Sequence, residues 1–245
     1  MASYLVDYCE QLDPVLLHEV KEEKRVSPTA GRRQESFTAR AEKSALMWLA
    51  EHTPLWINSD HLTVLGFAAQ LLAGGGYALA RWNRYALLLV IAALVLNWLG
   101  DSLDGTLARY RQQQRPRYGF YVDHMVDSLG ALALMGGLAV SGFMHPYLAI
   151  GLLVGFLLLS MQSYLATYTL GEFRLSFWSF GPTELRILLA VGNIALFFRP
   201  IVHIFGKTHR LFDVGGVIGV IGMGLMLLVW TAQNTYKLYN QERIR

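Results

Sequence analysis

The chain has 245 residues, of which 53% are hydrophobic and only 16% are charged, with a formal net charge of +3. This composition holds more apolar surface than a soluble domain of this size needs for its core, so it favours a membrane protein. The positive charge does not indicate a nucleic-acid partner, because the Lys and Arg residues lie at the borders of long apolar segments, where they are expected to meet lipid.

Residues 1–58 form the first predicted unit, a polar cytosolic N-terminal arm, and residues 59–245 form a transmembrane domain. A break in the arm is expected at Ser27 to Gly31, which includes Pro28. From Ser36 to Glu51, apolar residues recur at helical spacing and predict an amphipathic helix. Such a helix either lies along the membrane surface or docks against the rest of the protein, and the sequence leaves both alternatives open.

About six apolar segments follow the arm, each long enough to cross a hydrocarbon layer of ~30 Å, which needs ~20 helical residues. Short polar segments separate them, so neighbouring helices are expected to run antiparallel in one bundle. The predicted fold class is therefore all-α, a polytopic membrane protein with a bundle of about six transmembrane helices. These predicted spans cover approximately residues 61–81, 85–109, 118–142, 147–170, 184–205 and 213–237.

The distribution of positive charge predicts the orientation in the membrane. With the arm in the cytoplasm, the inner segments hold 16 of the 21 Lys and Arg residues. Cytoplasmic segments carry an excess of these residues, so both chain termini are expected in the cytoplasm. The single cysteine, Cys9, excludes a disulfide within the chain and, with the compact length, favours a bacterial inner membrane over an organelle membrane.

Four aspartates lie within 27 residues around one predicted inner loop. Asp101 and Asp104 are three residues apart near the end of one span, and Asp123 and Asp127 are four apart near the start of the next. Each pair shares a helix face, and the short loop brings both pairs to the same membrane boundary. One ionised aspartate at membrane depth costs ~2.5–3.5 kcal/mol on insertion scales, so four together need compensating positive charge. Divalent cations that prefer oxygen ligands supply it, and clustered carboxylates can hold two such ions around a phosphate.

Small and basic residues beside the first aspartate pair have two interpretations each. Gly105 and Ala108 leave space for a flat group to approach the helix, or they only permit close helix packing. Arg109 can donate two hydrogen bonds to a phosphate, or it can mark the cytoplasmic end of the span. His124 is the helix neighbour of Asp123 and is expected to point away from both carboxylates, so it is not a predicted metal ligand.

Taken together, these residues resemble the signature of the CDP-alcohol phosphotransferases, also called CDP-alcohol phosphatidyltransferases. That signature is two aspartates, a glycine, Ala-Arg, a spacer, a second glycine and two further aspartates. The spacer here, between Arg109 and Gly119, is nine residues where the family usually has eight. The fixed positions are filled by Asp101, Asp104, Gly105, Ala108, Arg109, Gly119, Asp123 and Asp127.

The resemblance implies an enzyme that transfers a phosphoalcohol group from a CDP-alcohol donor to an alcohol acceptor, with release of CMP and with a lipid as one of the two substrates. It implies that Asp101, Asp104 and Asp123 hold two Mg²⁺ or Mn²⁺ ions, and that Asp127 contacts the metals and acts as general base. It also implies a homodimer. The residues implied in binding the nucleotide and its phosphates are Gly105, Ala108, Arg109 and Gly119.

The sequence leaves the two substrates open. The compact length and the number of spans resemble bacterial enzymes that use CDP-diacylglycerol. In contrast, Asp123-His124-x-x-Asp127 and Gly181-Pro182-Thr183-Glu184 resemble elements of the choline and ethanolamine phosphotransferases, which use a CDP-amino alcohol and diacylglycerol.

Four further residues are candidate contacts outside the signature. Asp60 and Thr63 resemble the family's Asn-x-Leu-Thr element, with Asp in place of Asn, and the resemblance implies that they help bind the nucleotide. Glu184 and Arg186, at the cytoplasmic start of the fifth span, are either acceptor contacts or interfacial charges.

Two other classes of function explain the sequence less well. An ion or proton-coupled transporter could use intramembrane carboxylates as a relay, but these carboxylates cluster at one boundary and no interrupted inverted repeat is apparent. A role as a non-catalytic scaffold does not explain why four aspartates converge at one membrane boundary.

Overall fold

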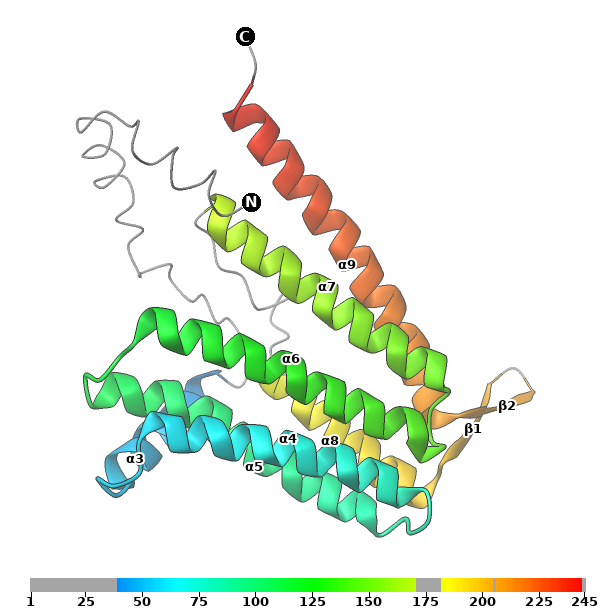
Figure 1. The fold of residues 1–245 in the computed structure, drawn as a ribbon. Helices are drawn as coiled ribbons and strands as arrows, with labels where there is room; N and C mark the ends of the chain where they lie inside the picture. The colour runs from blue at the N-terminus through cyan, green and yellow to red at the C-terminus, as the bar shows by residue number, and fades with distance from the viewer. Residues whose placement is uncertain (1–38, 171–181, 205, 244–245) are drawn as a thin grey trace, which may run out of the picture.

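The computed structural model describes residues 39–170, 182–204 and 206–243, so the predicted break at residues 27–31 lies outside the described residues. Helices dominate the described part of the chain (Figure 1). In chain order the elements are α3 (Ala39–His52), α4 (Ser59–Ala80), α5 (Ala86–Tyr110), α6 (Pro116–Ser141), α7 (Pro146–Leu170), α8 (Pro182–Phe198), β1 (Ile201–Ile204), β2 (Lys207–Arg210) and α9 (Leu211–Gln241).

Five of the described helices, α4, α5, α6, α7 and α9, are long and apolar enough to cross a membrane. The prediction of an all-α polytopic membrane protein is thus confirmed. The fifth predicted span is shorter than expected, because α8 has 17 residues and ends at Phe198 instead of continuing to residue 205. Pro200 explains this early end, since the residue before a proline is disfavoured in the α conformation.

A β-hairpin replaces the predicted end of that span. Strands β1 and β2 pair antiparallel, with Ile201 opposite Arg210, and Gly206 between them has a φ of 75°. Glycine adopts positive φ without steric cost, which suits this tight turn. The hairpin lies at the end of the bundle opposite α3 (Figure 1).

Local signals in the sequence set the ends of α4 and α6. The side chain of Asn58 accepts a hydrogen bond from the His61 backbone N–H at 3.2 Å and so caps the start of α4. Pro116 occupies the first position of α6, where its missing N–H costs nothing. Gly142, with a φ of 82°, ends α6 in the left-handed conformation.

The core of the bundle lies between α4, α5 and α6, with α8 packed against α5. Small residues allow the close approach of α4 and α6, because a Cβ atom at Gly137 would lie 2.0 Å from the carbonyl oxygen of Gly74. A buried hydrogen bond from Asn193 of α8 to the hydroxyl of Tyr77 on α4, 2.7 Å long, ties α8 to this core. Helices α7 and α9 run side by side and diverge from the bundle (Figure 1).

Helix α3 is the predicted amphipathic helix of the arm. Its residues Leu46 and Ala50 are buried in a small cluster with Leu62 of α4 and with Leu103 and Leu107 of α5. The structure shows that this helix docks against the bundle, while its position along the membrane surface stays a prediction. This docking places α3 beside the helix that carries the first aspartate pair.

Candidate active site

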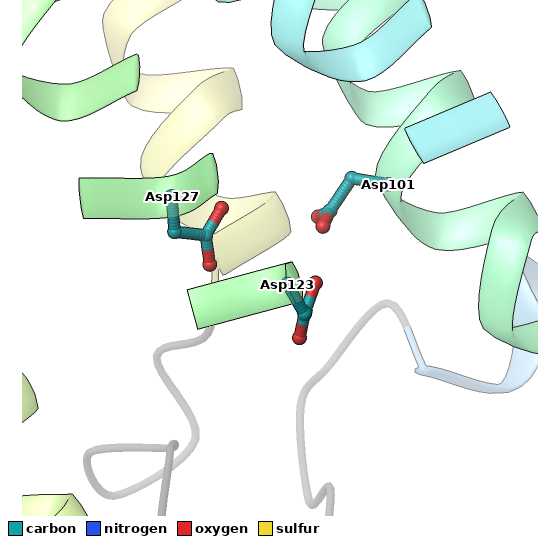
Figure 2. Close-up of side chains that lie close together, drawn as sticks. All are labelled: Asp101, Asp123 and Asp127. Carbon is teal, nitrogen blue, oxygen red and sulfur yellow. The ribbon is translucent and has the colours of Figure 1, made fainter. Parts of the chain in front are cut away.

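Three of the four predicted aspartates meet where α5 and α6 face each other. Asp101 of α5 and Asp123 and Asp127 of α6 are partly buried, and their carboxylates are directed toward one another (Figure 2). Each offers one oxygen, and these oxygens lie within 4.8 Å of one another. A close set of carboxylate oxygens is the donor set that hard divalent cations prefer. The three residues could therefore hold a metal ion.

Asp104 is not part of this group of three. Its Oδ2 atom accepts a hydrogen bond from the Thr63 hydroxyl at 2.7 Å, and its backbone carbonyl accepts one from the Ser59 hydroxyl at 3.0 Å. Both donors lie in the first turns of α4. Asp104 is thus held by α4, one helical turn beyond Asp101.

Arg186 of α8 places a positive charge at the edge of the aspartate group. Its Nη2 atom lies 2.6 Å from Oδ2 of Asp101, and its Nε atom donates to Oδ1 of Asn97 at 2.8 Å. Asn97 is buried and its side-chain amide donates to the Gly66 carbonyl at 3.0 Å. The guanidinium is thereby fixed in direction, and its charge offsets part of the mutual repulsion of the carboxylates.

A pocket of about 390 Å³ opens where α4 begins and α5 ends. Asp60 and Ala108, two of the predicted nucleotide contacts, line it together with Ser59, Arg111 and Arg115. Asp60 also forms an ion pair with Arg115. The hydrogen bond from Ser59 to the Asp104 backbone connects the pocket wall to the helix of the aspartates.

A comparison with known protein families bears on this arrangement. The sequence model of the CDP-alcohol phosphatidyltransferase family matches residues 56–230, which is more than half of the chain. The chain belongs to this family. The match includes the aspartates, the pocket and five of the seven described helices in full. The predicted family is thereby confirmed, and with it the prediction of a phosphotransferase.

A curated protein similar to this chain is an archaetidylinositol phosphate synthase from Pyrococcus horikoshii. It is 27% identical over 115 residues, which cover 47% of this chain and 54% of the relative. The chain thus matches about half the length of that protein.

The other signature residues lie farther from the group of three aspartates. A Cβ atom at Gly105 would meet only the guanidinium of Arg109, at 3.3 Å, and Arg109 donates to the Thr106 hydroxyl at 3.1 Å. Gly119 is exposed, and a Cβ atom there would have no neighbour within 4 Å. Glu184 lies in the first turn of α8, two residues before Arg186.

The long spacer of this family member forms a short connection between α5 and α6. Helix α5 ends at Tyr110 and α6 begins at Pro116, while Gln112 has a positive φ of 56°. Arg111 donates hydrogen bonds to the carbonyls of Thr53 at 2.8 Å and Pro54 at 3.0 Å. These bonds fix the connection to the segment after α3. The extra residue of the spacer is accommodated in this connection, so the aspartates keep their places on α5 and α6.

Sequence reasoning did not find two residues that contact the site helices. Asn97 could have been noticed, because a buried amide inside an apolar span usually has a specific partner. Glu42 of α3 had no such signal, because an acidic residue is ordinary on the polar side of an amphipathic helix.

Proposed function

We propose that this protein transfers a phosphoalcohol group, in particular a phosphatidyl group, from a CDP-alcohol donor such as CDP-diacylglycerol to an alcohol acceptor, with release of CMP, in phospholipid biosynthesis. The observation that carries the proposal is the group of three carboxylates whose oxygens lie within 4.8 Å of one another. A pocket of about 390 Å³ lies at the end of α5, the helix that carries Asp101. Membership of the CDP-alcohol phosphatidyltransferase family supports it. The name of the archaeal relative makes an inositol phosphate the first acceptor to test.

Asp101, Asp123 and Asp127 fit a divalent cation by their donor chemistry, and we assign them as ligands of Mg²⁺ or Mn²⁺, with Asp104 contributing to a second ion. Divalent ions held by these residues would neutralise the negative charge of the donor diphosphate and of the leaving CMP. Asp127 accepts the proton of the attacking acceptor hydroxyl. The hydroxyl oxygen bonds to the phosphorus that carries the alcohol, and the bond from that phosphorus to the bridging oxygen breaks, so that CMP departs.

The pocket at the start of α4 is assigned to the CMP part of the donor. Ala108 of α5 and Asp60 of α4 line it, and Gly105 and Arg109 lie on the same helix end as Ala108. Thr63 supports the site indirectly, by its hydrogen bond to the Asp104 carboxylate. Gly119 leaves open space at the start of α6. An acceptor would approach from the side of α8, where Glu184 and Arg186 lie.

The Ala108→Leu substitution tests the nucleotide pocket. The larger side chain would occupy space in the pocket, so we expect the KM for the CDP-alcohol donor to rise roughly tenfold while kcat changes less. Initial rates of CMP release over a range of donor concentrations measure both constants. Ala92→Leu, at an exposed position of the same helix, is the control. An unchanged donor KM in the Ala108 variant would place the nucleotide elsewhere.

The Thr63→Val substitution tests the support of Asp104. Valine keeps the shape of threonine but removes the hydroxyl that lies 2.7 Å from the Asp104 carboxylate. One hydrogen bond to a charged group stabilises by ~1.5–3 kcal/mol, so kcat should fall by roughly ten- to a hundredfold. Thr169→Val is the control, because the Thr169 hydroxyl bonds to the Leu165 carbonyl of its own exposed turn. Equal rates for both variants would show that Asp104 does not depend on Thr63.

Three further features belong to the proposal. The excess of Lys and Arg at the inner segments supports an active site that faces the cytoplasm, and a bacterial inner membrane is proposed as the location. A homodimer is proposed from the family resemblance. The division into an arm at residues 1–58 and a membrane domain at residues 59–245 stays a prediction.

The experiment that tests the proposed function is CMP release by purified protein in detergent with Mn²⁺. CDP-diacylglycerol is offered with inositol phosphate, glycerol phosphate or serine, and CDP-choline and CDP-ethanolamine are offered separately with diacylglycerol. Turnover with CDP-diacylglycerol makes the protein a phosphatidyltransferase and identifies its acceptor. Turnover only with a CDP-amino alcohol assigns the protein to the choline and ethanolamine phosphotransferases. If no combination of substrates yields CMP, the proposal is refuted.

A further inference from the structure

A carboxylate on α3 connects three helices beside the aspartate group. The Oε1 atom of Glu42 accepts hydrogen bonds from Nε1 of Trp98 at 3.0 Å and from the hydroxyl of Ser102 at 3.4 Å, both on α5. The same oxygen accepts a hydrogen bond from the hydroxyl of Thr183 on α8 at 2.9 Å. One charged oxygen on the arm helix is thus the shared acceptor for donors on two other helices.

These contacts lie directly beside the contacts of Arg186. Trp98 and Ser102 immediately follow Asn97 and Asp101 in the sequence, and Asn97 and Asp101 are the two residues that Arg186 binds. Thr183 precedes Arg186 by three residues, which is about one turn of α8. Glu42 and Arg186 therefore join the same turns of α5 and α8.

Apolar packing holds the start of α8 only weakly. Between Thr183 and Gly192 no described residue is fully buried, and the buried residues of α8, Asn193 and Leu196, lie toward its other end. Polar contacts at the start of α8 therefore largely determine where Arg186 lies. Hydrogen bonds to a charged acceptor are stronger than neutral ones, particularly where water is scarce.

We propose that Glu42 is a positioning residue for the transfer reaction: it fixes the first turn of α8 on α5 and thereby holds Arg186 against Asp101. This inference rests on the proposed function. It makes α3 a structural part of the active site, because loss of the Glu42 carboxylate would free Arg186 to move and Asp101 to change its orientation relative to Asp123 and Asp127.

The first test compares Glu42→Ala with Glu51→Ala, which removes an exposed carboxylate from the same helix. We expect Glu42→Ala to lower kcat for CMP release roughly tenfold, with the donor KM within about threefold of wild type, and Glu51→Ala to leave both unchanged. Glu42→Gln keeps an oxygen acceptor for the three donors and should recover most of the rate. Equal rates for the Glu42→Ala and Glu51→Ala proteins would overturn the proposal.

The second test asks whether Glu42 acts through Arg186. The two side chains bind different residues, so effects of independent structural roles would multiply. We expect the Glu42→Ala, Arg186→Lys double variant to be no slower than Arg186→Lys alone. A double variant whose loss equals the product of the two single losses would show that Glu42 does not position Arg186.

A third measurement does not depend on activity. Hydrogen–deuterium exchange of the intact protein should become faster at residues 183–190 in Glu42→Ala and in Thr183→Val, and stay unchanged in Glu51→Ala. If wild-type protein releases no CMP, the proposed function fails, while the exchange rates still decide whether Glu42 fixes α8. Unchanged exchange in both variants would refute the positioning role even in an active enzyme.

Discussion

CMP release by the Asp127→Asn protein should fall by about three orders of magnitude, because general acid–base catalysis contributes roughly 10²–10⁴ and the substitution also removes a charge from the candidate metal site. Asparagine has nearly the same size as aspartate, so the packing of α6 is preserved. Its amide cannot accept the proton of the acceptor hydroxyl. The measurement is the initial rate of CMP release at saturating donor, acceptor and Mn²⁺.

Asp213→Asn is the matched control for this substitution. Asp213 lies in the first turn of α9 at the opposite end of the bundle, where its carboxylate accepts a hydrogen bond from the His145 backbone N–H at 2.6 Å. An asparagine oxygen can accept the same bond, so this variant should keep the wild-type rate. If Asp127→Asn retains activity within about fivefold of wild type, another group takes the proton, and the assignment of Asp127 as general base is wrong.

The part of the site that lies within single helices could be predicted from the sequence. Residues three or four apart share a helix face whatever the rest of the fold does, so the directions of Asp101 and of the Asp123 and Asp127 pair followed from spacing alone. A short polar loop then required the two faces to meet at one end. The helix bounds followed from apolar length, with small errors except at α8, where Pro200 stops the helix early.

Contacts between helices that are distant in the sequence could not be predicted in the same way. Spacing places Asp104 on the same face as Asp101, but its turn toward Thr63 depends on how closely α4 approaches α5. The ion pair of Arg186 with Asp101 depends on the packing of α8. Glu42 reaches Trp98 and Thr183 only because α3 docks against the bundle, which the amphipathic pattern allowed but did not require.

The close approach of α4 and α5 at Gly100 gives the second large prediction. A Cβ atom on Gly100 would lie 2.5 Å from the backbone nitrogen of Gly66 and 2.6 Å from the carbonyl oxygen of Leu62. Both neighbours are backbone atoms, which cannot move aside by a change of rotamer. Gly100→Ala must therefore push α4 and α5 apart, at a cost of ~1–3 kcal/mol for overpacking.

This separation should damage the site as well as the fold, because Gly100 directly precedes Asp101. The hydrogen bond from Asn97 to the Gly66 carbonyl would lengthen, and Asn97 also orients Arg186. We expect Tm to fall by roughly 5 °C and CMP release to fall at least tenfold in protein that is still folded.

Gly75→Ala separates the effect of close packing from that of the added methyl group. Gly75 lies on α4, and a Cβ atom there would meet nothing within 4 Å, so both Tm and activity should stay at wild-type values. Thermal unfolding in detergent and CMP release on the same samples give the comparison. If Gly100→Ala lowers Tm but leaves activity intact, the aspartate group tolerates a wider spacing of α4 and α5, and its geometry is then set by α6 and α8 alone.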